Sequence, residues 1–287
     1  MIEPVLKDDT LLADIMAARQ DPDHFHLWWL GQSGYLIQWS GRHLLLDPYL
    51  SDSLTRKYAD TTIPHVRMTE RAVAPERLDF IDVVTSSHNH TDHLDGETLG
   101  PLLRINPAMA LVIPEANRQF VADRLQIDPG QPLGMEDGTR QTVAGFEFIG
   151  VPSAHEALER DDQGRDKFLG YIVRFGDWTI YHGGDTVRYD GMAQRLRAWS
   201  IDVALLPING TDPSRGVPGN LTGPEAAQLA HDIHARLVVP GHYEMFEFNT
   251  ASSDSFLSTA LGLGQPVRLL RCGEHWSSAE LNQLERD

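Results

Sequence analysis

The 287-residue sequence contains a single cysteine, Cys272. One cysteine excludes a disulfide framework and a zinc cluster built from cysteine ligands. Basic residues are also scarce, because 24 Lys and Arg stand against 41 Asp and Glu and give a formal net charge of -17. A negative charge of this size repels phosphate backbones, so it argues against nucleic acid as a partner or a substrate.

Long apolar runs are absent as well. No run approaches the roughly 18 consecutive apolar residues of a membrane span. The acidic segment 1–20 lacks the apolar core of a signal peptide. Apolar residues make up 41% of the chain and charged residues 23%, which is ordinary for a globular protein with a sizeable core. We therefore expect a soluble, cytoplasmic protein that binds no membrane. Whether it forms a homo-oligomer is left open by the sequence.

The spacing of apolar residues predicts one layered α/β domain over residues 1–287, with a short N-terminal helix at 10–19. No linker or low-complexity segment divides the chain. Strands are predicted in ten places: 25–30, 35–39, 43–46, 81–87, 110–113, 145–151, 168–175, 178–182, 203–208 and 237–239. Further helices are predicted in five places: 96–105, 115–125, 190–199, 224–234 and 252–261.

Histidine and aspartate cluster directly after one of these strands. Residues 86–95 read SSHNHTDHLD. In an extended segment, residues i and i+2 point the same way, so His88 and His90 can face one centre, with Asp92 and His93 in the turn beyond. Neutral imidazoles and carboxylates are the usual ligands of zinc and similar divalent ions. The alternative, in which Asp92 or Thr91 only caps the next helix, does not explain why three histidines cluster here.

Three further apolar strands end in small residues and then one side chain that can bind a metal: His155, Asp185 and His242. Ligands gather at the carboxyl ends of strands, where the loops diverge and leave room. Each of these signals is weak alone, and their joint occurrence is strong. The sequence therefore predicts that the four strand ends build one metal site.

Other residues carry weaker signals. The apolar run 44–46 ends in Asp47, which we interpret as a partner that holds a ligand histidine, the alternative being a turn residue. Asn209 follows a strand and Tyr243 follows a ligand candidate, so either could donate a hydrogen bond to a substrate oxygen. His182 alternates with apolar residues on a strand, which is typical of a hydrogen-bonded core histidine rather than of a ligand.

The order and spacing of these segments resemble the metallo-β-lactamase superfamily. The matching segments are HxHxDH at 88–93, the lone His155, GGDT at 183–186 and PGH at 240–242. The resemblance extends over about residues 25–276. Within the superfamily the sequence is most similar to the ascorbate-6-phosphate lactonase branch, through LWWLGQSGYLI at 27–37, IYHGGDT at 180–186 and ARLVVPGHYEMF at 235–246.

The resemblance implies an αββα four-layer sandwich, the metallo-β-lactamase fold, in which helices flank two mixed sheets. It also implies two metal positions that share one carboxylate: His88, His90 and His155 for one ion, Asp92, His93 and His242 for the other, and Asp185 between them. The chain would hold one or two divalent ions, zinc or manganese, and the sequence does not decide between these options.

Hydrolysis is the chemistry that fits such a site. Two ions about 3.5–4 Å apart share a water and lower its pKa toward about 7, so hydroxide is available at neutral pH to attack an acyl or phosphoryl centre. Asp92 is the expected catalytic residue, because it can orient this nucleophile and carry a proton to the leaving group.

The sequence thus predicts a metal-dependent hydrolase whose partner is a small molecule, an ester or a lactone. The branch resemblance favours a phosphorylated sugar lactone. A phosphodiesterase is the alternative, and the negative charge disfavours a nucleic-acid-processing enzyme. A non-catalytic scaffold is disfavoured because all seven ligand positions hold competent residues. We expect the longest irregular stretches, the polar surface segment 51–80 and the charged insertion 156–167, to border the opening of the site.

Overall fold

The computed structural model describes residues 1–216 and 218–281, and its first strands bury both of their faces. Successive side chains of a strand point to opposite faces of the sheet. In the first strand, Leu27 and Trp29 join one hydrophobic cluster, while Trp28 and Leu30 join another. A sheet that is apolar on both faces requires a covering layer on each side.

The first sheet has seven strands: β1 (His26–Gly31), β2 (Gly34–Trp39), β3 (Arg42–Leu46), β4 (Val83–Thr85), β5 (Ala110–Pro114), β6 (Leu133–Met135) and β13 (His275–Ser277). Their spatial order is β13-β1-β2-β3-β4-β5-β6. The strands from β13 to β3 pair antiparallel, and those from β3 to β6 pair parallel.

The second sheet has six strands: β7 (Arg140–Val143), β8 (Phe146–Pro152), β9 (Leu169–Phe175), β10 (Trp178–His182), β11 (Val203–Pro207) and β12 (Leu237–Gly241). Their order is β12-β11-β10-β9-β8-β7. β7 to β10 pair antiparallel, and β10, β11 and β12 pair parallel. Both sheets are therefore mixed, as expected.

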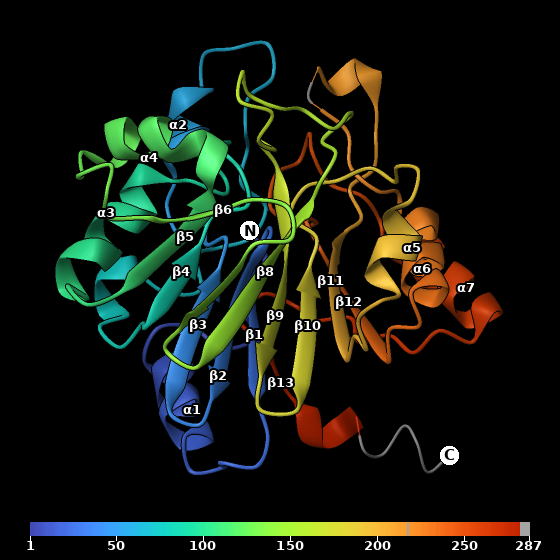
Figure 1. Ribbon diagram of the computed structural model, residues 1–287, viewed down its shortest axis with the longest axis horizontal. Helices are drawn as coiled ribbons and strands as arrows, with labels where there is room; N and C mark the ends of the chain where they lie inside the picture. The colour runs from blue at the N-terminus through green and yellow to red at the C-terminus, as the bar shows by residue number, and fades with distance from the viewer. Residues whose placement is uncertain (217, 282–287) are drawn as a thin grey trace.

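Helices cover the outer face of each sheet (Figure 1). The helices α1 (Asp9–Ala18), α3 (Gly96–Ile105) and α4 (Arg118–Leu125) share a hydrophobic cluster with the first sheet. The helices α5 (Met192–Leu196), α6 (Gly223–Asp232) and α7 (Asp254–Leu263) pack on the second. The layer order is thus helix, sheet, sheet, helix, which confirms the expected αββα sandwich.

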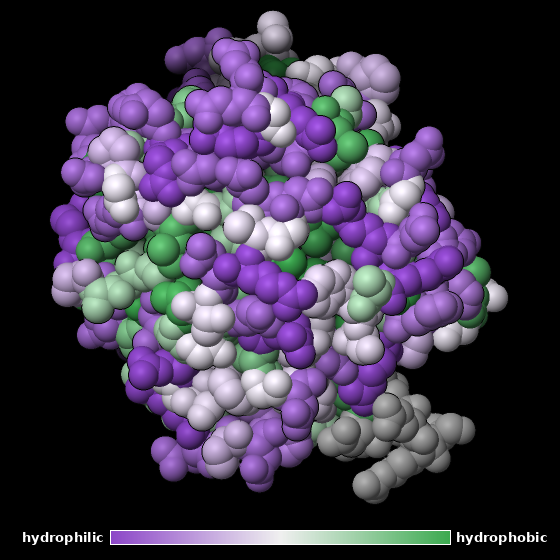
Figure 2. Space-filling view, viewed as in Figure 1, coloured by the Kyte–Doolittle hydropathy of each residue, from purple (hydrophilic) through white to green (hydrophobic). Residues whose placement is uncertain are grey.

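The surface in Figure 2 is dominated by hydrophilic residues, and the hydrophobic ones lie in small separate groups. This matches the excess of acidic residues in the sequence. Among the described residues, no helix has the length and apolar character needed to cross a membrane.

Helix caps fix the loops that leave the strands. Asp95, the last residue of the SSHNHTDHLD segment, caps α3 by accepting hydrogen bonds from the backbone N–H of Glu97 and from the hydroxyl of Thr98. Thr222 and Glu225 form a reciprocal capping box at the start of α6. Side-chain caps of this kind contribute about 0.5–2 kcal/mol each. They therefore anchor two of the loops that lie over the sheet edge.

The predicted strands and helices are present, with ends shifted by a few residues, but segment 51–80 differs from its prediction. It contains the short helix α2 (Ser53–Lys57) and a 3₁₀ turn at Pro75–Arg77, and Leu54, Val73 and Leu78 are buried. Segment 51–80 is therefore partly a core element and not simply a polar surface stretch. Further 3₁₀ turns lie at Glu115–Asn117, Pro213–Arg215 and Ser278–Glu280. The sequence pattern does not predict β6, β7 or β13.

Candidate metal centre

The loops that follow β4, β8, β10 and β12 bring seven potential metal ligands together at one edge of the sandwich. They form two groups: His88, His90 and His155 in the first, and Asp92, His93, Asp185 and His242 in the second. Within each group the ligand atoms lie within 4.8 Å of one another. The structure thus assembles all seven residues that the sequence analysis selected as ligands.

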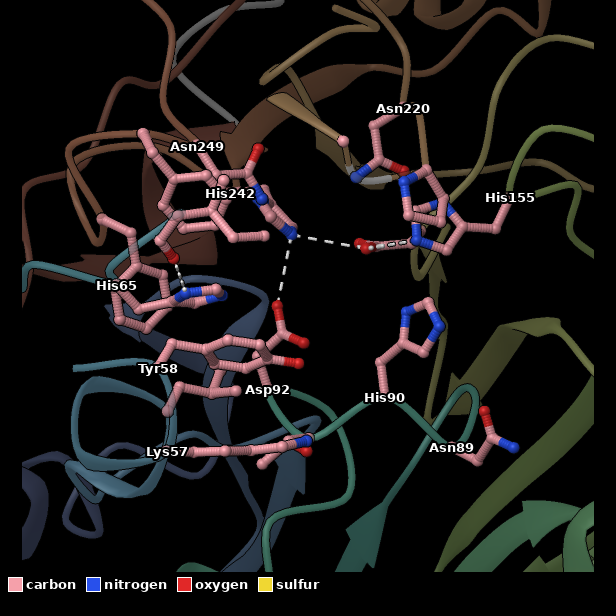
Figure 3. Close-up of a pocket in the computed structure, with 18 of the residues that line it drawn as sticks. Lys57, Tyr58, His65, Asn89, His90, Asp92, His155, Asn220, His242 and Asn249 are labelled. Carbon is pink, nitrogen blue, oxygen red and sulfur yellow. Dashed lines mark hydrogen bonds and ion pairs between the residues drawn. The ribbon is translucent and has the colours of Figure 1, made fainter. Parts of the chain in front are cut away.

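Asp185 lies between the two groups. One of its carboxylate oxygens is 3.3 Å from His93 Nε2, and the other is 3.4 Å from His155 Nε2 and 3.3 Å from His242 Nε2. Figure 3 shows His242 facing Asp92, whose Oδ2 is 3.5 Å from His242 Nε2. A single carboxylate is therefore in reach of both groups, which is the arrangement expected of a bridging ligand.

The buried polar atoms of the site fit a divalent cation. The Nε2 atom of His88 is buried and has no hydrogen-bond partner in the described part of the chain. Leaving such an atom unpaired costs about 1–3 kcal/mol. The carboxylates of Asp92 and Asp185 belong to the neighbouring donor group, and Asp185 acts electrostatically on His88. An imidazole lone pair and two carboxylates are donors that a divalent ion binds.

The protonation states differ between the two groups. Burial lowers the pKa of His88 and of His90, so their imidazoles are neutral and their lone pairs are free. Burial also opposes charge on His242, but the carboxylates of Asp185 and Asp92 outweigh it and raise its pKa to about 9. A cation that binds the second group must therefore displace a proton from His242.

Asp47 holds His93 in place. Its buried carboxylate lies 2.8 Å from His93 Nδ1 and also accepts hydrogen bonds from the Thr85 hydroxyl and the Ser87 backbone N–H. The Nδ1 atom of His93 is thus occupied by Asp47, and its Nε2 atom faces the other ligands of the second donor group. His155 is oriented in the same way, because its Nδ1 lies 2.8 Å from the Gly219 carbonyl oxygen. Such partners fix the tautomer and direction of a metal-binding histidine.

Tyr243 does not reach the cavity. Its ring stacks on Trp29 with centroids 4.4 Å apart, and its hydroxyl donates to the carbonyl of Leu270. The substrate contact predicted for Tyr243 is therefore wrong, because its hydroxyl, the only polar atom of its side chain, is used inside the core. His182 is buried with Nε2 3.3 Å from the Ser33 carbonyl oxygen, as expected for a core histidine.

Asn209 is one layer behind the cavity. Its amide nitrogen lies 2.9 Å from the Asn249 side-chain oxygen, and its amide oxygen accepts from Asn220 at 3.0 Å. Asn220 and Asn249 line the cavity, and Asn209 does not. The direct substrate contact predicted for Asn209 is therefore wrong, and the asparagine side chains that reach the cavity here are those of Asn220 and Asn249.

The donor groups open into a cavity of about 380 Å³. Three aromatic rings, those of Tyr58, His65 and Phe248, also border this cavity. The centroid of the His65 ring lies 4.1 Å from the centroid of each of the other two rings. Segment 51–80 borders the cavity, as expected. The insertion 156–167 does not, because none of its residues lines the cavity, so that prediction is wrong. Gly216, Pro218 and Asn220, together with segment 246–249, contribute to the border as well.

Gln32 is a residue of this site that the sequence analysis missed. It lies in the turn between β1 and β2, its side chain is fully buried, and its amide touches Asp92 and His242. The available signal was a long polar side chain, followed by Ser33, in the otherwise largely apolar segment LWWLGQSGYLI.

Comparisons with known proteins agree with this geometry. A family model described as the beta-lactamase superfamily domain matches residues 42–243. A UPF0173 metal-dependent hydrolase from Opitutus terrae is 28% identical over 254 residues, which are 86% of this chain and 97% of that protein. Another, from Thermococcus kodakarensis, is 30% identical over 216 residues, 75% of this chain and 82% of that one.

Solved structures share the fold. Igni18, a metallo hydrolase from the archaeon Ignicoccus hospitalis, superposes with a TM-score of 0.64 at 21% identity and covers 88% of this chain and 98% of its own. YhfI from Bacillus subtilis, a metallo-beta-lactamase fold protein, gives 0.63 at 16% identity over 89% and 100% of the two chains. With the family match over most of its length, the chain belongs to the beta-lactamase superfamily.

Proposed function

We propose that this protein is a metal-dependent hydrolase of a small ester or lactone. The observation that carries the proposal is the pair of donor groups that meet at Asp185 at the edge of a cavity. The two groups would hold a divalent ion, which would lower the pKa of a bound water from 15.7 toward about 7 and make hydroxide available at neutral pH. The names of the relatives, metal-dependent hydrolases, support the same reaction class.

Asp92 is the residue proposed to move the proton. Its carboxylate belongs to the second donor group and also lines the cavity, so it faces both the metal position and the substrate. A carboxylate placed there can accept a proton from the attacking water and deliver it to the leaving oxygen. His242 and His93 hold the pKa of Asp92 well below its ordinary value against the effect of burial. Asp92 is therefore ionised at neutral pH, which is the form that can orient a water by accepting its hydrogen bond.

The cavity supports a small substrate. Its volume of about 380 Å³ is at the small end of ligand pockets, which span about 300–1,000 Å³. Lys57 and Arg124 line it, and among the described residues neither has a carboxylate in an ion pair. In Figure 3 the Lys57 side chain extends toward the donor groups below Asp92. These cations suit a substrate with an anionic group, in line with the phosphorylated sugar lactone that the branch resemblance favours.

A phosphodiesterase is the second candidate, because the same two-metal arrangement cleaves phosphate esters. The net charge of -17 disfavours a nucleic-acid strand as the diester. The test is a panel of lactones, phosphorylated lactones, simple esters and bis(p-nitrophenyl) phosphate, assayed on metal-free protein and after reloading with zinc or manganese. We expect metal-dependent turnover of a lactone or ester. Turnover of the diester alone would overturn the proposed substrate class.

A further inference from the structure

Gln32 is held rigidly beside the second donor group. Its backbone carbonyl accepts hydrogen bonds from the His242 N–H at 2.8 Å and from the Trp29 indole N–H at 3.0 Å. Its backbone has a φ of 53°, which ordinary residues rarely adopt, so the turn holds the residue in an unusual conformation. The side chain is fully buried and has no freedom to turn to solvent.

The Gln32 amide lies as far from two of the candidate ligands as neighbouring ligands of one metal ion lie from each other. Its amide nitrogen lies 2.8 Å from Asp92 Oδ2 and 3.0 Å from His242 Nε2. The ligand atoms already assigned to this group are 3.3–3.5 Å apart where His242 meets Asp185 and Asp92. Around a six-coordinate ion with metal–oxygen distances of about 2.1 Å, adjacent donors are about 3.0 Å apart. The amide therefore falls within the same coordination shell.

The choice of amide atom follows from the environment. An amide oxygen and nitrogen exchange places when the group rotates by half a turn, and the hydrogen-bond network decides between them. In the orientation present, Oε1 is buried without a hydrogen-bond partner among the described residues. The half-turn would bring Oε1 to the position between Asp92 and His242. With a cation at those ligands, an oxygen in that position gains a partner, whereas an NH₂ group cannot bind a metal.

We propose that the amide oxygen of Gln32 is a fifth protein ligand of the second metal site, beside Asp92, His93, Asp185 and His242. This rests on the proposed function, in which that group binds a divalent ion. Five protein ligands, three of them oxygens, exceed the tetrahedral set that structural zinc takes and suit an ion that accepts five or six ligands, such as manganese. The additional oxygen donor thus shifts the preference of the second site toward manganese, compared with the same site without Gln32.

The test is titration of metal-free protein with manganese chloride and with zinc chloride, followed by calorimetry and, for manganese, by electron paramagnetic resonance. In Gln32→Ala we expect manganese affinity at the second site to fall by at least about tenfold, with the first site unchanged and a smaller loss for zinc. Gln32→Glu, which keeps an oxygen donor, retains manganese binding. Gln32→Leu keeps the side-chain volume without the oxygen and gives the same loss as alanine.

Gln38→Ala is the matched control. Gln38 is also fully buried without side-chain partners among the described residues, but it lies toward the far end of β2, opposite His26 and His43. We expect it to leave both affinities unchanged. Unaltered manganese binding in folded Gln32→Ala and Gln32→Leu would overturn the ligand role while leaving the proposed function intact. Absence of metal binding in the unsubstituted protein would overturn both.

Discussion

Replacing Asp47 by alanine tests whether the second donor group depends on its support. The Asp47 carboxylate accepts hydrogen bonds from His93, from the Thr85 hydroxyl at 2.7 Å and from the Ser87 N–H at 3.1 Å. Removing it leaves these buried donors unpaired, at about 1–3 kcal/mol each. Some of them will find new partners, so we expect a loss of about 3–5 kcal/mol in the free energy of unfolding.

The same change frees the His93 ring to rotate. Loss of a partner that orients a metal-binding histidine typically lowers metal affinity about 10–100-fold, which is about 1.4–2.7 kcal/mol. The assay is urea unfolding with and without metal, together with calorimetric metal titration. Asp82→Ala is the control, because Asp82 also accepts hydrogen bonds, from the His43 N–H and from Arg42, but lies away from the donor groups. Equal metal affinity in Asp47→Ala and unsubstituted protein would refute the reasoning.

Three further predictions concern catalysis, pH and specificity. Asp92→Asn lowers kcat by about 10²–10⁴-fold, because the amide cannot carry the proton, and a variant with more than about a tenth of the normal rate would remove that role. Because the pKa of His242 is about 9, the affinity of the second site rises with pH up to about 9, as calorimetry from pH 6 to pH 9 will show, and a flat profile would contradict this. Lys57→Ala raises KM for an anionic lactone and leaves KM for a neutral one unchanged, with Lys167→Ala as a control outside the cavity. Equal KM changes for both lactones would argue against the charge contact.

The sequence pattern predicts a layered α/β domain and the seven donors because both signals are local, whereas the αββα order of the layers came from the resemblance to the metallo-β-lactamase superfamily. Strands such as β1 and β3 show apolar runs, and each donor follows a strand or a motif directly. The three strands that were missed depend on tertiary contacts instead. β7 is polar and largely exposed, and β13 has only three residues and exists through its pairing with β1.

Side-chain direction in the turns is harder to predict. Tyr243 follows His242 in the sequence, yet the two point to different places, because His242 has a φ of 61° and Glu244 a φ of 56°. Such left-handed residues reverse the chain in a way that no pattern of apolar spacing records. The insertion 156–167 does not border the cavity for a related reason. Asp161 accepts hydrogen bonds from the backbone N–H groups of Gln163 and Arg165, so the segment folds onto itself.

We propose that two donor groups joined by Asp185 hold the ions that drive hydrolysis. The most direct measurement is anomalous X-ray diffraction, at the zinc and manganese absorption edges, on crystals of the protein purified and then supplied with each metal. The account predicts anomalous peaks among His88, His90 and His155, and among Asp92, His93 and His242, on either side of the Asp185 carboxylate. Crystals of active, metal-supplied protein with no anomalous peak at either group would contradict it.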